Sequence, residues 1–198
     1  MSELIQLNAN NKLIVCFGGM ALLMGGIPPF EFVNYLSSIY KNEYDLIFYI
    51  DKFQCCYHKG IKDITNNIDE TVIYLNDKIK CGNYNKVIFM GVSAGGYAAI
   101  LFGSLCNINN IVAFIPPTIL KKPINSKYQD LKNVINSQSN YLLYADLSIT
   151  NINDMHHVSQ CQNIDCFSNV TVVNNPIINM KKLRDTGIIK DIIDNFSK

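Results

Sequence analysis

Charged side chains are scarce in this sequence, and neither sign prevails. Asp, Glu, Lys and Arg make up 17% of the 198 residues, with 17 basic residues against 16 acidic ones. A chain whose charges nearly balance has no net electrostatic attraction to a phosphate backbone or to an anionic lipid surface. The composition therefore excludes nucleic acid as an expected partner.

The sequence also lacks a long unbroken apolar run and a secretion signal. Its longest apolar stretch, near Leu13 to Phe32, is interrupted by four glycines and two prolines, so it cannot form a continuous membrane-spanning helix. The first eleven residues are mixed and polar, without a basic region followed by an apolar one. We expect a cytoplasmic protein with no membrane span.

What the sequence does contain is a regular alternation of short apolar runs with segments of helical length. Alternation of this kind favours a parallel sheet with helices on both faces, because each crossover between parallel strands needs a helix. No repeat or linker interrupts it, so residues 1–198 are interpreted as one domain with a doubly wound, six-stranded α/β sheet. The expected strands are Leu13–Phe17, Leu46–Ile50, Lys86–Met90, Ile111–Ile115, Tyr141–Ala145 and Val170–Val173. The expected helices are Phe30–Tyr40, Ile64–Lys80, Ala94–Leu105, Tyr128–Asn136, Met155–Gln162 and Asn179–Phe196.

The clearest chemical motif follows the third expected strand. It reads Gly91-Val-Ser93-Ala-Gly95 and leads directly into a helix of small residues. A sharp turn between strand and helix is the setting of a nucleophilic serine, and the N–H of Ala94 at the helix start would stabilise an oxyanion. The alternative is that the glycines only permit close packing and that Ser93 is a helix N-cap.

A second motif, Gly18-Gly19-Met20, follows the first strand. Because glycines have no side chain, the backbone after this strand can point an N–H at a substrate oxygen. Gly19 or Met20 is therefore expected to supply the second oxyanion donor. The alternatives are an ordinary turn and a dinucleotide site. The latter is weaker, because a third glycine in register is missing and Asp51 is the only candidate ribose ligand.

An acidic residue, Asp146, ends the strand Tyr141–Ala145, two strands after the serine. A carboxylate there can orient a histidine and stabilise its protonated form, as the third member of a catalytic triad does. The alternative is that Asp146 caps the turn formed by residues 149–154.

Together these motifs resemble the α/β-hydrolase superfamily, and specifically its small capless members from bacteria and viruses. The resemblance runs from Leu13 to the C-terminus, but only the Ser93 turn is specific. This resemblance implies a minimal α/β-hydrolase fold and a base histidine just after the last strand, near Ile177. Residues 174–179, however, contain no histidine. The matching stretches are Phe17-Gly18-Gly19, Pro28–Phe32, Asp51–Gly60, Gly91–Gly96 and Lys182–Gly187.

The sequence contains three histidines, and all of them follow strand ends: His58, His156 and His157. His156 would lie near the start of a helix capped by Asp154. There the helix dipole disfavours the protonated imidazole and keeps it able to act as a base. An interpretation of all three as partly exposed loop or helix-start histidines stays open.

Neither a metal nor a cofactor is expected. Cysteines lie near His58 and near His156, but their spacing matches no structural zinc pattern. Two hypotheses remain. The first is a serine hydrolase of esterase or acyl-transfer type acting on a small-molecule ester, with Ser93, Asp146 and His156 as catalytic residues and Gly19 and Ala94 as oxyanion donors. The second is a catalytically degenerate protein that keeps the cleft as a binding surface.

Overall fold

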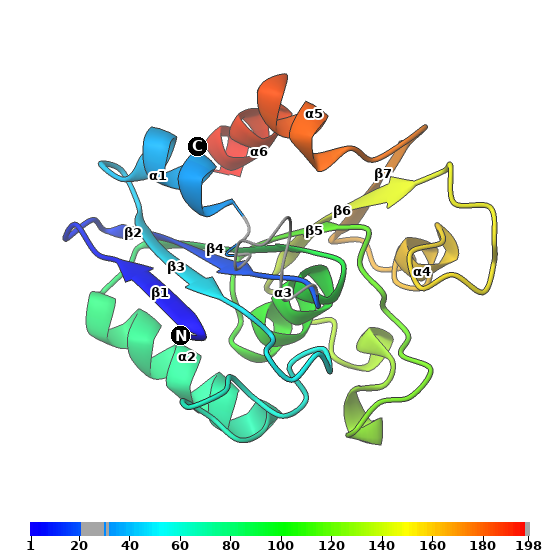
Figure 1. The fold of residues 1–198 in the computed structure, drawn as a ribbon, viewed down its shortest axis with the longest axis horizontal. Coiled ribbons are helices and arrows are strands. Elements are labelled where there is room, and N and C mark those ends of the chain that lie inside the picture. The colour runs from blue at the N-terminus through cyan, green and yellow to red at the C-terminus, as the bar shows by residue number, and fades with distance from the viewer. Residues whose placement is uncertain (21–29, 31, 197–198) are drawn as a thin grey trace.

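A single β-sheet forms the middle of the molecule (Figure 1), and in the residues that the structure describes it has seven strands. The computed structural model describes residues 1–20, 30 and 32–196, so Pro28 and Pro29 lie outside the described residues. The strand order is β1-β3-β2-β4-β5-β6-β7, and only β1 runs antiparallel to its neighbour. The strands are β1 (Glu3–Gln6), β2 (Lys12–Phe17), β3 (Asp45–Tyr49), β4 (Lys86–Val92), β5 (Asn110–Phe114), β6 (Asn140–Asp146) and β7 (Val170–Asn175).

Helices cover both faces of this sheet, as Figure 1 shows. Alternate side chains of a strand point to opposite faces, so Leu13, Val15 and Phe17 of β2 enter one core while Ile14 and Cys16 enter the other. The first core is closed by α2 (Ile68–Gly82), α3 (Ala94–Leu105) and α4 (Ser159–Gln162). The second is closed by α1 (Val33–Tyr40), α5 (Met180–Asp185) and α6 (Ile188–Phe196). None of the helices in the described ranges is both long and apolar enough to cross a bilayer.

The expected fold class is confirmed, but the expected strand count was one too low. The missed strand, β1, lies at the sheet edge and pairs with β3, with Glu3 opposite Tyr49. Its four residues are all half-buried, so they show no clear alternation between a buried and an exposed face. This absence of a period-two pattern explains why the polar N-terminal segment did not predict a strand.

Three expected helices are shorter or divided. Residues 128–136 form two 3₁₀ turns, Ser126–Tyr128 and Leu131–Asn133, because the side chains of Asn125 and Asp130 accept backbone N–H groups locally. The C-terminal helix is split into α5 and α6 at Gly187, whose φ is 82°. The segment 155–162 is helical only over α4. The helix expected to end at Lys80 ends at Gly82, and the next residue, Asn83, caps it in the left-handed conformation.

The strand order creates a switch point between β2 and β4. From β2 the chain proceeds to β3 on one side, and from β4 it proceeds through β5, β6 and β7 on the other. The loop after β2 leads to α1 on one face, whereas β4 leads to α3 on the opposite face. Open α/β sheets bind ligands at such a point, beyond the carboxyl ends of the strands. Gly18 and Ser93 are the first residues beyond these two strand ends.

Candidate active site

Ser93 occupies the turn between β4 and α3 in a strained backbone conformation. Its φ is 54° and its ψ is −122°, and a positive φ is uncommon for a residue with a side chain. Two backbone hydrogen bonds hold the turn: Ser93 N donates to Phe114 O at 2.9 Å, and Tyr97 N donates to Ser93 O at 3.0 Å. Backbone strain of this kind costs about 1–3 kcal/mol and is concentrated at functional sites.

Gly91 and Gly95 allow the backbone of the switch point to close tightly around Ser93. A Cβ at Gly95 would lie 1.9 Å from Phe17 O, and a Cβ at Gly91 would lie 2.3 Å from Gly95 C. Both distances are far below van der Waals contact. The two glycines therefore bring the end of β2 against the start of α3, which puts the loop that contains Gly19 beside Ser93.

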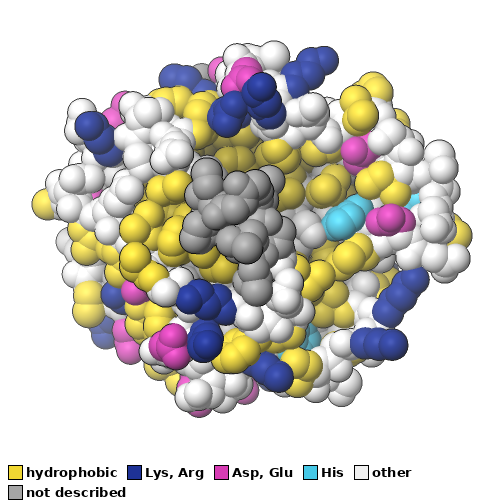
Figure 2. Space-filling view, in the orientation of Figure 1, with side chains coloured by type: hydrophobic (Ala, Val, Ile, Leu, Met, Phe, Trp, Pro, Cys, Tyr) yellow, Lys and Arg dark blue, Asp and Glu magenta, His cyan; other side chains and the backbone are white. Residues whose placement is uncertain are grey.

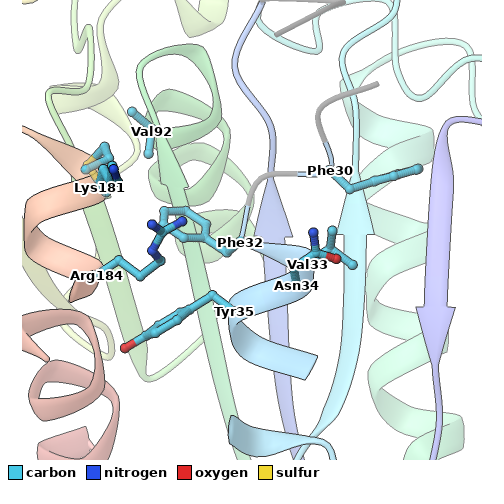
Figure 3. Close-up of a pocket in the computed structure, with 9 residues that line it drawn as sticks. Phe30, Phe32, Val33, Asn34, Tyr35, Val92, Lys181 and Arg184 are labelled. Carbon is cyan, nitrogen blue, oxygen red and sulfur yellow. The ribbon is translucent and has the colours of Figure 1, made fainter. Parts of the chain in front are cut away.

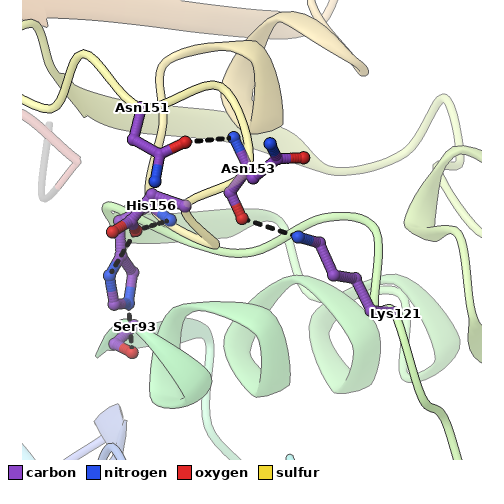
Figure 4. A network of polar contacts seen from close by, with 6 residues as sticks. Ser93, Lys121, Asn151, Asn153 and His156 are labelled. Carbon is purple, nitrogen blue, oxygen red and sulfur yellow. Dashed lines mark hydrogen bonds and ion pairs between the residues drawn. The ribbon is translucent and has the colours of Figure 1, made fainter.

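The imidazole of His156 lies in hydrogen-bonding contact with Ser93 (Figure 4). The distance between Ser93 Oγ and His156 Nε2 is 2.7 Å. The His156 side chain is 25% exposed, and its partial burial lowers the pKa of the imidazole below 6.5, while nearby Asp154 acts in the opposite direction. His156 is therefore biased toward the neutral form, which can accept a proton from the serine hydroxyl.

The carboxylate nearest to this imidazole belongs to Asp154. Its Oδ1 accepts the backbone N–H of His156 at 2.8 Å and lies 3.5 Å from His156 Nδ1. A negative charge on that side favours the tautomer with the proton on Nδ1, which leaves Nε2 as the acceptor facing Ser93. From the sequence, Asp154 was expected only to cap a helix, so its place beside Nδ1 of His156 was missed. The short spacing Asp154-Met-His156 was the available signal.

Asp146, the acid expected from the sequence, forms its hydrogen bonds with groups other than His156. Its Oδ1 accepts the N–H and the hydroxyl of Ser148 at 2.8 and 2.6 Å, and its Oδ2 accepts the N–H of Ile178 at 2.8 Å. Burial opposes ionisation of Asp146, but these hydrogen bonds outweigh it and lower the pKa of the carboxyl. Within the described residues it has no hydrogen bond or ion pair to His156. Its contact with Ile178 joins it to the loop in which the resemblance placed a histidine.

The other two histidines lie apart from the serine. His58 is buried: its Nδ1 accepts the N–H of Asn125 at 3.1 Å, so its Nε2–H donates to the Tyr97 hydroxyl at 2.9 Å. Burial lowers the pKa of His58 and keeps this imidazole neutral in its structural network. His157 bonds through Nδ1 to the hydroxyl and N–H of Ser159. Of the three histidines, His156 is the one that contacts Ser93.

The two expected oxyanion donors flank the same turn. Ala94 is the first residue of α3, so its N–H has no acceptor within the helix backbone. On the β2 side, Gly18 N donates to Tyr49 O at 2.8 Å, so this N–H is already used and does not serve as an oxyanion donor. The buried Tyr57 hydroxyl donates to Gly18 O at 3.0 Å, and Gln54 Nε2 donates to Met20 O at 2.7 Å. These two contacts fix the carbonyls on either side of Gly19.

The segment that carries Asp154 and His156 is tied to the loop after β5. Gln160 Oε1 accepts the N–H groups of Thr118 and Ile119, each at 2.8 Å, and Lys121 Nζ donates to Asn153 O at 2.7 Å (Figure 4). The Thr118 hydroxyl also donates to Gln160 O. These bonds attach both ends of the segment to a neighbouring loop and so define the position of the imidazole.

Replacing Gln160 by alanine is expected to lower the free energy of unfolding by about 1–3 kcal/mol, because two backbone N–H groups lose their shared acceptor. The matched control is Gln160→Glu, whose carboxylate oxygen can accept both bonds and is expected to retain most of the stability. Urea titration followed by circular dichroism measures both. Equal stability of wild type and Gln160→Ala would contradict the role of this anchor.

No group of three His, Cys, Asp or Glu side chains within the described parts of the chain is arranged to hold a metal ion. The candidate site brings together a serine, a histidine and a carboxylate at the start of α3, where the first backbone N–H groups lack a helical acceptor. This is the donor set that acyl transfer through a covalent serine intermediate requires.

Comparisons with known proteins find similarity in structure but not in sequence. No protein-family model matches the chain, and no curated protein matches its sequence. The capsule O-acetyltransferase of Neisseria meningitidis serogroup A, solved in complex with CoA, superposes with a TM-score of 0.67 at 14% identity, over 96% of this chain and 90% of that one.

Two further structures superpose over similar lengths. Esterase 2 of Thermogutta terrifontis, phosphoramylated by tabun, gives a TM-score of 0.64 at 11% identity, over 98% of this chain and 89% of that one. MenH from S. aureus gives 0.61 at 12% identity, over 99% and 97%. These structures and this chain share a mostly parallel α/β sheet with helices on both faces. The chain therefore has the α/β-hydrolase fold.

Proposed function

We propose that this protein is a serine hydrolase of the esterase or acyl-transfer type. Ser93 is the nucleophile, His156 the general base and Asp154 the residue that orients the base. Ala94 and Gly19 supply the oxyanion N–H groups. The observation that carries this proposal is the 2.7 Å contact between Ser93 Oγ and His156 Nε2, at a serine with a φ of 54°.

The chemistry follows from these positions. His156 Nε2 takes the proton of the Ser93 hydroxyl while Oγ attacks the carbonyl carbon of the ester, and the carbonyl oxygen becomes an anion beside the start of α3. The protonated His156 then gives its proton to the leaving alcohol as the ester bond breaks. Water, activated by the same imidazole, releases the acid and restores Ser93. An acceptor alcohol in place of water would give acyl transfer.

The structural neighbours support both outcomes without choosing between them. One is described as an esterase and another as an O-acetyltransferase solved with CoA. Their low identity limits this support to the fold. The assignment of a reaction to this chain depends on the contact between Ser93 and His156.

Labelling with a fluorophosphonate probe tests the proposal. Wild type is expected to form a covalent adduct that Ser93→Ala does not form, because the probe reacts with an activated serine hydroxyl. Ser38→Ala, at an exposed serine of α1, is the matched control and is expected to label like wild type. If wild type and Ser93→Ala are both folded and label equally, the catalytic proposal fails. The hypothesis of a catalytically degenerate protein that keeps the cleft as a binding surface is then favoured.

The pH dependence of kcat/KM for a p-nitrophenyl ester provides a second prediction. Activity requires neutral His156, and burial lowers the pKa of this imidazole below 6.5. We therefore expect kcat/KM to fall only as the pH drops through a midpoint below 6.5, with full activity at pH 7. A midpoint above 6.5 would contradict the assigned environment of the base.

Asp154→Asn separates the two candidate acids. The asparagine oxygen can still accept the His156 N–H, but the charge that raises the pKa of His156 is lost. We expect the acidic midpoint to move to lower pH and kcat to fall by about 10- to 100-fold. Asp146→Asn is expected to leave the midpoint unchanged, because its carboxylate bonds to Ser148 and Ile178. A midpoint shift confined to Asp146→Asn would identify Asp146 as the orienting acid.

A further inference from the structure

A pocket of about 400 Å³ lies between the start of α1 and the exposed side of α5 (Figure 3). This volume is in the range of small-molecule sites. Its walls are mainly apolar and include Phe30, Phe32, Val33 and Val92. Lys181 and Arg184 of α5 line its edge. The catalytic steps proposed above do not use this pocket.

The pocket begins one residue away from the proposed nucleophile. Val92 is the last residue of β4 and packs toward the core closed by α1, α5 and α6, while the hydroxyl of the next residue, Ser93, contacts His156. The leaving alcohol has to lie on the His156 side, because that imidazole protonates it. The acyl side of the ester can then extend past Val92 into the pocket.

One wall of the pocket is built at a conformational cost. Phe32 takes a left-handed conformation, with a φ of 66°, although it is neither glycine nor asparagine. Its ring packs against Phe114 of β5, with ring centroids 6.3 Å apart. This packing holds the aromatic wall in place, as expected for a preformed apolar binding surface.

The edge of the pocket carries positive charge. Lys181 and Arg184 are three residues apart on α5 and so lie on the same side of the helix. Arg184 Nε donates to Asp185 Oδ1 at 2.8 Å. The Asp185 carboxylate also interacts electrostatically with Lys181, whose ammonium group forms no ion pair with a described residue. No carboxylate is among the described residues that line the pocket. Figure 2 shows Lys and Arg atoms beside hydrophobic atoms in this region, on a face that also exposes a histidine.

We propose that this pocket binds the acyl chain of the substrate and that the chain is apolar and ends in a carboxylate. Lys181 and Arg184 hold the terminal carboxylate, and the aromatic and aliphatic walls hold the methylene groups. This inference rests on the proposed function and adds the substrate class to it. An arginine beside a lysine suits a carboxylate, because the guanidinium offers paired N–H donors and both side chains are cationic.

Matched pairs of p-nitrophenyl esters test the substrate class. Each monoester of a straight-chain diacid, from glutarate to suberate, is compared with the neutral ester of equal carbon number, from pentanoate to octanoate. We expect kcat/KM to be about tenfold higher for the diacid monoester at the chain length that spans the pocket, and this preference to shrink at high salt. Equal values at every length would overturn the proposal.

Charge-neutral variants locate the contact. Arg184→Gln and Lys181→Gln are each expected to lower kcat/KM several-fold more for the preferred diacid monoester than for the neutral ester of equal carbon number. Lys182→Gln, an equal change of charge at an exposed position of the same helix that does not line the pocket, is the control. If Lys182→Gln reduces the preference as much as Arg184→Gln, the preference reflects overall charge and the proposed contact is wrong.

Binding measurements separate failure of the pocket from failure of the proposed function. If wild type hydrolyses no ester and Ser93 is not labelled, the proposed function has failed. Calorimetric titration with suberate then tests the pocket directly. Binding that Arg184→Gln weakens and Lys182→Gln preserves would support the carboxylate site, and absence of suberate binding would overturn it.

Discussion

Replacing His156 by alanine is expected to lower kcat for an activated ester by about four to six orders of magnitude. Loss of the base removes proton transfer from Ser93, and in serine hydrolases the removal of either the serine or the histidine has effects of this size. The 2.7 Å contact between the two side chains is the structural basis for the prediction. Steady-state kinetics with p-nitrophenyl acetate, after correction for spontaneous hydrolysis, measures the loss.

The neighbouring histidine provides the matched control. His157 bonds to Ser159 and forms no hydrogen bond with Ser93 in the described part of the chain, so His157→Ala is expected to keep kcat within a few-fold of wild type. Both variants should show the wild-type circular dichroism spectrum. If His157→Ala loses activity and His156→Ala does not, the base has been assigned to the wrong imidazole.

Replacing Gly95 by alanine is expected to lower the free energy of unfolding by about 3 kcal/mol or more, at the upper end of the range for overpacking. The added Cβ would lie 1.9 Å from Phe17 O and 2.7 Å from Phe17 C, and both are backbone atoms of a central strand that cannot move aside. The expected result is insoluble protein, or a denaturation midpoint shifted strongly to lower urea.

Gly187 offers a control that separates packing from backbone conformation. It has a φ of 82°, but nothing lies within 4 Å of a Cβ placed there. Gly187→Ala therefore carries only the left-handed backbone cost of about 1–2 kcal/mol. Similar losses in the two variants would show that close approach at Gly95 is not the dominant effect.

Local patterns in the sequence predicted much of the fold. The strand Lys86–Met90, the turn at Ser93 and the helix Ala94–Leu105 are contiguous, and each is favoured by its own residues. In contrast, residues 128–136 were expected to form a helix from length and composition alone. There, side chains such as Asp130 bind nearby backbone N–H groups and stop a helix from forming.

The candidate site was less predictable, because it depends on the path of one loop. The order of serine and then acid along the chain pointed to Asp146, which ends a buried strand. That carboxylate bonds to Ser148 and Ile178, whereas the locally paired Asp154 and His156 reach the site because the loop after β6 brings the imidazole to Ser93. Whether a histidine ten residues after the end of one strand can reach a serine in the turn after another strand is not encoded in local propensity.

The proximity of Asp154 and His156 along the chain has a consequence for how this fold can diversify. Their spacing is set by a single tight turn, because Asp154 accepts the N–H of His156. In the proposed mechanism one short segment therefore supplies both the base and the residue that orients it, and bonds to Lys121 and Gln160 hold that segment against the loop after β5. Under that proposal the segment after β7 does not supply the base, so the proton transfer places no demand on a histidine there.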